Sequence, residues 1–258
     1  MNLLQTIVAH KFKEVAELKA NMPEQDLVKA AQFNRPCYSL IKNLTTEGST
    51  GVIAEFKRKS PSKGFINEHA DVVEITKGYC HASAAGLSIL TDYHFFGGST
   101  SDLLKARVNE IPILRKDFII DRYQITESKA MGADVILLIA ACLTVHEVNT
   151  FAAYAVGLGL EVLLELHDEA ELAHICNHTT LIGINNRNLK NFEVDTVAAI
   201  KMANKIPSNK IKIAESGIAS KQMMQAFKNV GYQGFLIGEM FMKAAKPAEA
   251  LYNFVKNN

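Results

Sequence analysis

The sequence predicts an α/β fold, a closed (β/α)8 barrel with an N-terminal helical extension, from three observations. Strand-like apolar runs alternate with helix-like stretches from about residue 50 onward, which is typical of parallel strands joined by helical crossovers. The runs number eight and are rich in Val, Ile and Leu, the composition of strands buried on both faces. The chain has 258 residues, close to the roughly 250 of such a barrel.

Glycines and caps mark where the predicted helices end and begin. SAAG precedes Leu87 and KAMGA precedes Asp134, and glycine commonly ends a helix because it tolerates the left-handed conformation. Thr144, with Glu147 three residues later, forms a capping box at a helix start. The predicted strands are 52–57, 87–91, 112–116, 134–139, 161–166, 181–185, 211–215 and 234–238.

The whole chain, 1–258, is predicted to form one barrel domain. No linker rich in Gly, Pro or Ser divides it. A doubly wound open sheet is the alternative architecture, but it would more often carry G-x-G-x-x-G after the first strand, and that motif is absent.

Residues 1–50 precede the first predicted strand and form the extension. Its apolar side chains lie at positions 4, 7, 8, 12, 15 and 18, the spacing of one face of a helix. A second helical stretch is expected from about Glu24. The first helix could plug the bottom of the barrel or cover the catalytic mouth, and the sequence leaves both possibilities open.

Composition indicates a globular protein that binds neither nucleic acid nor membrane. The net charge is +1 and 48% of the residues are hydrophobic, so no general attraction to polyanions is implied. No apolar run approaches the roughly 20 residues of a membrane span. The four cysteines are far apart, without CxxC, which favours reduced thiols. We therefore expect a cytoplasmic protein.

The segment IAEFKRKSPSKG (53–64) raises the question of function, because it places Glu55 and Lys57 on one face of a strand. Active sites of (β/α)8 barrels form at the carboxyl ends of the strands. Polar residues recur at those ends in this chain, so the face that carries Glu55 and Lys57 is expected to point into the mouth of the barrel. The other strand-end residues are Thr91, Asp92, Arg115, Lys116, Asp117, Phe118, Glu165, Asn185, Asn186, Arg187, Glu215, Ser216, Gly217, Gly238 and Glu239.

This set of side chains predicts acid–base chemistry on an anionic substrate. Lysines among apolar walls and other cations can have lowered pKa values and donate protons near neutral pH, and buried glutamates can have raised ones. Gly217 and Gly238 with Glu239 fit a phosphate site of backbone amides after the last two strands. A single Glu–Lys pair could equally be a structural ion pair, but agreement with six other strand ends favours function.

The motifs IAEFKRKSPSKG, SILTDYHFFGGS, ILRKDFIID, LLELHDEAEL, IGINNRNL, IAESGI and FLIGEMFM together closely resemble indole-3-glycerol phosphate synthases. The resemblance runs from the N-terminal helix to the C-terminus. It implies an enzyme of tryptophan biosynthesis that converts 1-(2-carboxyphenylamino)-1-deoxyribulose 5-phosphate by closing the indole ring with loss of CO2 and water. It also implies that no cofactor and no metal is needed. We expect a monomer that can associate with other enzymes of the pathway.

The resemblance also implies roles for individual residues. Lys116 resembles the general acid for ring closure, and Lys57 a cation that holds the substrate anions and donates the proton for dehydration. Glu165 and Glu55 resemble carboxylates that orient the lysines and shuttle protons. How the lysines divide the two acid steps stays open. Asn185 and Ser216 resemble residues that position intermediates, and Ser60, Arg187 and Glu215 resemble residues that contact the substrate. Phe96, Phe118 and Leu236 resemble the slot for the aromatic ring. Gly217, Gly238 and Glu239 resemble the phosphate site.

Other interpretations remain. His174 and His178 in HICNH are four residues apart, as in some zinc sites, but a solvated helix end is favoured. His94 lies in a loop near the mouth and could touch substrate or have no role. A phosphoribosylanthranilate isomerase-like barrel and a non-catalytic binding barrel are the alternative functions. The loop 58–65 could close as a lid.

Overall fold

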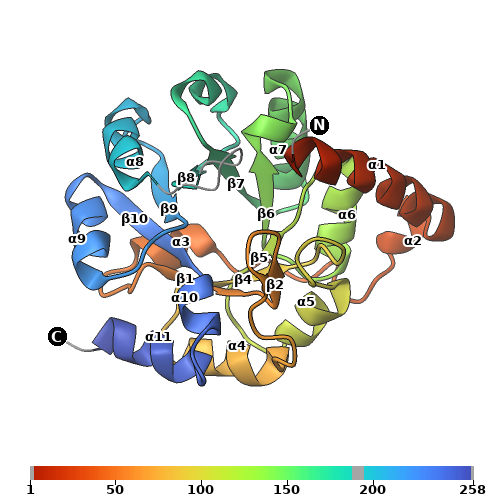
Figure 1. Ribbon diagram of the computed structural model, residues 1–258. Coiled ribbons are helices and arrows are strands. Elements are labelled where there is room, and N and C mark those ends of the chain that lie inside the picture. The colour runs from red at the N-terminus through yellow and green to blue at the C-terminus, as the bar shows by residue number, and fades with distance from the viewer. Residues whose placement is uncertain (1–2, 188–194, 257–258) are drawn as a thin grey trace.

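The computed structural model describes residues 3–187 and 195–256. Within them, eight parallel strands close into a barrel in the order β1-β10-β9-β8-β7-β6-β5-β4, so that neighbours in sequence are neighbours in space. The helices surround this ring (Figure 1). The (β/α)8 prediction is confirmed. The strands are β1 (Val52–Phe56), β4 (Gly86–Leu90), β5 (Ile113–Lys116), β6 (Val135–Ile139), β7 (Glu161–Leu166), β8 (Leu181–Asn185), β9 (Ile211–Glu215) and β10 (Tyr232–Ile237).

Helices connect successive strands, and several begin where the sequence predicts. The Thr144 hydroxyl accepts from the amide of Glu147, whose side chain accepts from the amide of Thr144. None of the helices in the described segments is long and apolar enough to cross a bilayer. The helical elements of the barrel are α4 (Val72–His81), α5 (Thr100–Ala106), α6 (Arg122–Ala130), η1 (Ala140–Cys142), α7 (Val145–Gly157), η2 (Glu169–His174), α8 (Thr196–Met202), η3 (Ala203–Lys205), α9 (Lys221–Asn229), α10 (Glu239–Met242) and α11 (Pro247–Lys256).

The segment after β1 forms an antiparallel hairpin of β2 (Lys59–Ser60) and β3 (Gly64–Phe65). The Arg58 guanidinium fixes its base, because it donates to both carboxylate oxygens of Asp102 at the start of α5. The predicted loop 58–65 is therefore an ordered hairpin in this structure, and its closure over substrate remains a prediction.

The N-terminal extension reaches both ends of the barrel. Helix α1 (Leu3–Asn21) buries Ile7, Lys11 and Val15 and lies on the side of the catalytic mouth, where Ile7 lines the central cavity. The alternative of covering the mouth is thus correct for the first helix. The second predicted stretch is only the short α2 (Glu24–Leu27).

A helix that the sequence did not predict, α3 (Leu40–Thr45), closes the bottom. Leu40 and Leu44 belong to the buried cluster inside the barrel. Glu161, at the start of β7, accepts hydrogen bonds from the Ser39 hydroxyl and the amides of Leu40 and Ile41. A strand carboxylate thus caps the helix, which is favourable at a helix N-terminus.

Alternation along the strands creates two cores. Side chains such as Ile53, Leu163 and Ile213 fill the barrel interior below the mouth, whereas Val52 and Val162 pack outward against the helices. Because strand side chains alternate in direction, Glu55 continues the inward row that contains Ile53. This alternation brings the polar strand ends together above an apolar floor.

Candidate active site

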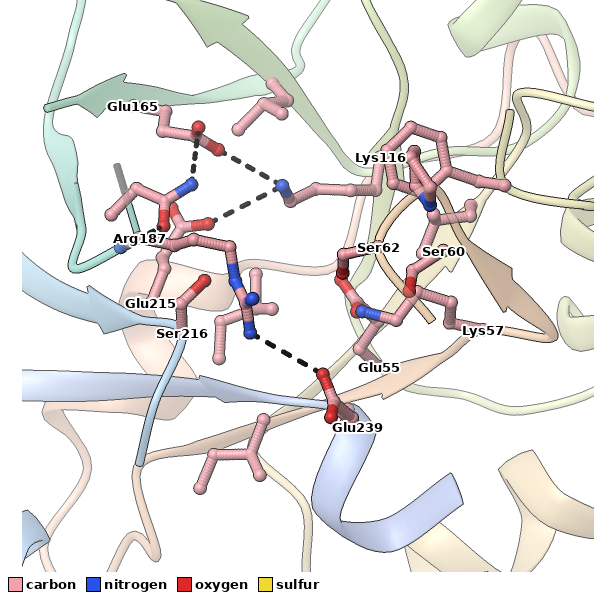
Figure 2. A pocket seen from close by; sticks show the side chains of 18 of the residues that line it. Glu55, Lys57, Ser60, Ser62, Lys116, Glu165, Arg187, Glu215, Ser216 and Glu239 are labelled. Carbon is pink, nitrogen blue, oxygen red and sulfur yellow. Dashed lines mark hydrogen bonds and ion pairs between the residues drawn. The ribbon is translucent and has the colours of Figure 1, made fainter. Parts of the chain in front are cut away.

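A cavity of about 530 Å3 opens at the carboxyl ends of the strands. Thr91, Arg115 and Asn186, from the predicted strand ends, do not line it. Every residue to which the family resemblance assigns a role does, and Figure 2 shows the polar ones converging from opposite strands. These residues are Glu55, Lys57, Ser60, Phe96, Lys116, Phe118, Glu165, Asn185, Arg187, Glu215, Ser216, Gly217, Leu236, Gly238 and Glu239.

Lys116 stands between two carboxylates. Its Nζ lies 3.1 Å from Glu165 Oε2 and 3.6 Å from Glu215 Oε2, and its side chain is 18% exposed toward the cavity. Asn185 Nδ2 donates to the other oxygen of Glu165 at 3.0 Å. Strands β5, β7, β8 and β9 thus fix one cluster (Figure 2).

The pKa of Lys116 differs from the lowered value expected for a lysine in this site. Burial alone would lower the pKa of Lys116, but the carboxylates of Glu165, Glu215 and Glu55 outweigh burial and raise it. The predicted lowering is therefore wrong for Lys116, because its neighbours are anions rather than other cations. Lys116 stays an ammonium at every working pH.

The two carboxylates around Lys116 have opposite shifts. Burial and the neighbouring charge of Glu165 raise the pKa of Glu215 to about 8. Burial acts on Glu165 in the same sense, but Lys116 and His167 outweigh it and lower the pKa of Glu165. Glu215 therefore fits the prediction of a glutamate with a raised pKa, whereas Glu165 is ionised.

Glycines provide space for two of these carboxylates. A Cβ on Gly183 would lie 2.1 Å from Glu215 Oε1, and one on Gly238 would lie 2.6 Å from Glu55 Oε1. Glu55 in turn pairs with Lys57, whose Nζ is 2.7 Å from Glu55 Oε1. Gly238 is thus required by the side chain of Glu55 as well as being placed at the expected phosphate site.

An apolar slot lies beside the charged cluster. The rings of Phe96 and Phe118 are 5.9 Å apart, and both line the cavity with Leu236. Leu4 and Ile7 of α1 add to this wall. The sequence did not assign these α1 residues to the site, although both belong to the predicted apolar stripe.

Glycines and charged side chains line the side of the cavity that follows β9 and β10. Ser216 and Gly217 line the cavity and have positive φ angles of 65° and 71°. Gly238 is the N-cap of α10, and the first amides of a helix lack partners within it. Arg187 pairs with Glu239 at 3.6 Å.

Lys243, which the sequence analysis missed, also lines the cavity. Its ammonium pairs with Glu239, one helical turn before it. The sequence did offer one indication: Lys243 is a basic residue four positions after Glu239, the last residue of the motif Gly238-Glu239.

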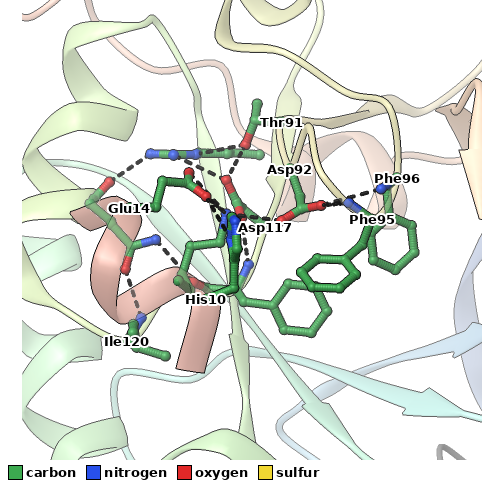
Figure 3. Close-up of polar contacts among 12 residues, drawn as sticks. His10, Glu14, Thr91, Asp92, Phe95, Phe96, Asp117 and Ile120 are labelled. Carbon is green, nitrogen blue, oxygen red and sulfur yellow. Dashed lines mark hydrogen bonds and ion pairs between the residues drawn. The ribbon is translucent and has the colours of Figure 1, made fainter. Parts of the chain in front are cut away.

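A second buried lysine joins α1 to the mouth. Lys11 Nζ lies 3.0 Å from each of Glu14 Oε2, Asp92 Oδ2 and Asp117 Oδ1, and the side chain is 0% exposed. Figure 3 shows Glu14, Asp92 and Asp117 converging from three elements. Asp92 also accepts from the amide of Phe96, so Lys11 is linked to the aromatic slot.

The histidines outside the cavity have contacts of their own. The ring of His94 stacks on that of His10 in α1, with centroids 4.6 Å apart. Both ring nitrogens of His174 lie 3.0 Å from backbone carbonyls, of Glu171 and Leu143. Residues 3–187 and 195–256 contain no group of three or more His, Cys, Asp or Glu that could hold a metal ion.

The fold and the cavity together define a class, a (β/α)8 barrel whose mouth holds a cluster of a lysine and carboxylates. The family model of indole-3-glycerol phosphate synthase matches residues 4–254. An indole-3-glycerol phosphate synthase of Bacteroides thetaiotaomicron is 43% identical over 256 residues, covering 99% of this chain and 98% of its own. That of Variovorax paradoxus is 41% identical, covering 97% of each. The chain belongs to the indole-3-glycerol phosphate synthase family, carboxy-lyases of tryptophan biosynthesis.

Solved structures support the fold alone. A tryptophan synthase α2β2 complex from Pyrococcus furiosus contains a chain with a TM-score of 0.58 at 14% identity, covering 81% of this chain and 97% of that one. A 3-hexulose-6-phosphate synthase reaches 0.61 at 12% identity, covering 80% and 99%. No comparison favours the isomerase-like or the non-catalytic alternative.

Proposed function

We propose that this cavity closes the indole ring of 1-(2-carboxyphenylamino)-1-deoxyribulose 5-phosphate, with Lys116 as the general acid. As the aromatic carbon attacks the ribulose carbonyl carbon, the carbonyl oxygen becomes an alkoxide and needs a proton. The Lys116 ammonium, which is protonated before the step and faces the cavity, can transfer its proton to this oxygen. The high pKa of Lys116 is compatible with this role because an alkoxide is more basic than an amine.

The loss of CO2 and water needs further proton transfers. Lys57 holds the substrate anions from the β1 side and donates a proton to the departing hydroxyl, supported by its 2.7 Å contact with Glu55. Glu55 and Glu165 orient the two lysines and act as proton acceptors, and one of them removes the final proton. Glu215 is the carboxyl group that holds a proton near neutral pH, which suits a proton store.

Substrate recognition follows the two sides of the cavity. The aromatic ring lies in the slot of Phe96, Phe118 and Leu236, and its carboxylate lies toward Ser60 and Arg187. Asn185 and Ser216 position the intermediates. The phosphate contacts the backbone at Gly217, Gly238 and Glu239, where glycines allow close approach.

One observation carries this proposal: Lys116 is held by carboxylates from opposite strands while its ammonium still faces the cavity. The test mixes purified protein, in EDTA, with the substrate and follows indole fluorescence. Lys116→Ala should abolish the rise, and Lys105→Ala, an exposed lysine of α5, should not. A folded Lys116→Ala variant with near wild-type activity would remove Lys116 from the acid role.

We also propose the finer features of the setting. The enzyme would act in the cytoplasm as a monomer on this small phosphorylated substrate, with the whole chain, 1–258, as one domain and without cofactor or metal. It would be able to associate with other enzymes of the pathway. The one-domain proposal is supported by the continuous barrel core and by the contacts of α1 and α3 with it. Sedimentation at several concentrations would test the monomer.

A further inference from the structure

His167 lies behind the catalytic cluster, outside the residues that line the cavity. It follows β7 directly, two residues after Glu165. Its Nε2 is 3.2 Å from Glu165 Oε1, and its Nδ1 is 3.6 Å from Glu171 Oε2 in η2. The side chain is 12% exposed, and neither ring nitrogen is accessible to solvent. A carboxylate on each side of a buried imidazole favours the imidazolium.

Glu171 holds the ring in place. Its Oε2 also accepts a 2.6 Å hydrogen bond from the backbone amide of His167. The carboxylate therefore binds the backbone of this residue and forms an ion pair with its ring. Glu171 thus acts on His167 as outer residues commonly act on functional side chains, by orienting them from outside the site.

Glu165 is thereby contacted on both oxygens. Oε2 faces Lys116, and Oε1 faces both Asn185 and His167. Among the described residues, Glu215, on the other side of Lys116, is influenced by Lys116, Glu165 and Glu55 and not by a histidine. The two carboxyl groups around one ammonium are therefore unequal in their surroundings.

We propose that His167 is a positioning residue that decides which of these two carboxyl groups holds a proton: as an imidazolium it keeps Glu165 ionised and leaves the proton on Glu215. The inference rests on the proposed function. It assigns to His167 no contact with substrate. Two acidic groups with opposite environments can divide the base and acid roles of one site.

The groups that face His167 support this assignment. Glu165 on β7 and Glu171 on η2 are the charged neighbours, and together they outweigh burial and raise the pKa of His167 to about 10. Cys142 on η1 also lies near these two carboxylates, and burial and their charges raise its pKa to about 12. It stays a neutral thiol, so the imidazolium has no competing partner there.

Two measurements on the full-length protein test the proposal. Ring nitrogen NMR of 15N-histidine-labelled protein, with His167→Gln to assign the signal, should show His167 protonated at pH 8, well above the ordinary midpoint of about 6.5. The pH profile of kcat/KM should contain an inflection near pH 8 that Glu215→Gln removes. In His167→Gln this inflection should move to higher pH by about one unit, because a cation near the carboxyl pair is lost.

Matched variants separate positioning from simple loss of structure. His146→Gln changes an exposed histidine of α7 and should leave the profile unchanged. His167→Gln should change kcat more than KM, and His167→Lys, which restores a cation, should return the inflection toward the wild-type pH. A neutral His167 at pH 7, or an unmoved inflection in folded His167→Gln, would overturn the proposal.

The NMR titration does not depend on turnover. A wild-type protein that forms no indole product would therefore refute the proposed function while the protonation of His167 was still decided. An active wild type with neutral His167 would refute only the positioning role.

Discussion

Two lysines in this molecule, Lys11 and Lys116, each lie among three carboxylates. Lys11, from α1, meets Glu14, Asp92 and Asp117, each at 3.0 Å, and is completely enclosed. Lys116 is influenced by Glu165, Glu215 and Glu55 but remains partly exposed to the cavity. The two clusters meet at the end of β5, where Lys116 and Asp117 point to opposite sides.

The difference teaches that charge composition does not distinguish a structural cluster from a functional one. Both lysines have raised pKa values despite burial. Lys11 has three carboxylates at 3.0 Å and no exposed surface for a ligand to contact. Lys116 has two direct carboxylate contacts and an open side, so its third donor is available to substrate. Free donor capacity toward a cavity, rather than charge, is what favours Lys116 over Lys11 as the catalytic residue.

The largest expected effect that tests this contrast is on activity. Lys116→Met should lower kcat by about 10³-fold, within the usual range for loss of a general acid. The fold should change little, because Glu165 and Glu215 line the cavity and can there bind a proton or be hydrated by water. Indole fluorescence and thermal unfolding measure the two properties. Unfolding at much lower temperature would show that Lys116 is structural in the same sense as Lys11.

The complementary change should act mainly on stability. Lys11→Met leaves Asp92 buried without its cation and Asp117 with Arg115 alone. Breaking such a buried pair costs about 3–5 kcal/mol of unfolding free energy. Lys13→Met, an exposed neighbour on α1, should stay within about 0.5 kcal/mol. Urea unfolding compares the variants. A small effect of Lys11→Met would mean that the network adds little beyond its desolvation cost.

Glu215 provides a pH-dependent comparison. Its pKa in the folded protein, about 8, lies above that of an unfolded glutamate. The folded state therefore binds more protons between about pH 4.5 and 8, and stability falls as pH rises through that window. Glu215→Gln should be more stable than wild type at pH 8.5, and the difference should shrink toward pH 5. Thermal unfolding across this range would contradict the assignment if the two proteins kept a constant difference.

Asp117 should show the opposite dependence in the structural cluster. Burial alone would raise its pKa, but Lys11 and Arg115 lower it to about 2. A lowered carboxyl pKa contributes stability that is present above the unfolded value of about 3.8 and is lost as pH falls toward 2. Lys11→Met should weaken this acid-dependent loss. Unfolding measured from pH 5 to 2.5 gives the slope, and equal slopes in both proteins would exclude the contribution of Lys11.

Much of the fold was predictable because it depends on local pattern. Strands β7, β8 and β9 have the predicted bounds, since each is a short apolar run flanked by caps and polar ends. The helix α3 was not predictable, because its six residues are stabilised by the distant Glu161 and by the barrel floor. A helix of that length has too few internal hydrogen bonds to be stable by itself.

The candidate site was predictable in its membership but not in its charge states. Glu55, Lys116 and Glu165 follow from strand ends and from family resemblance, and all of them line one cavity. The raised pKa of Lys116 was not foreseen, because it depends on which strands stand opposite β5 in the closed barrel. His167 is adjacent to the motif residue Glu165, yet its contact with Glu171 exists only once η2 folds back.

The sequence by itself determined the alternation of strands and helices, the polar strand ends and the family, because these depend on local periodicity and on motifs. Only the tertiary structure decided that α1 covers the mouth, that Lys11 and Lys116 have different neighbours, and that Glu165 and Glu215 titrate in opposite directions. Coulomb energies depend on distance and burial. Both are set by residues that are far apart along the chain.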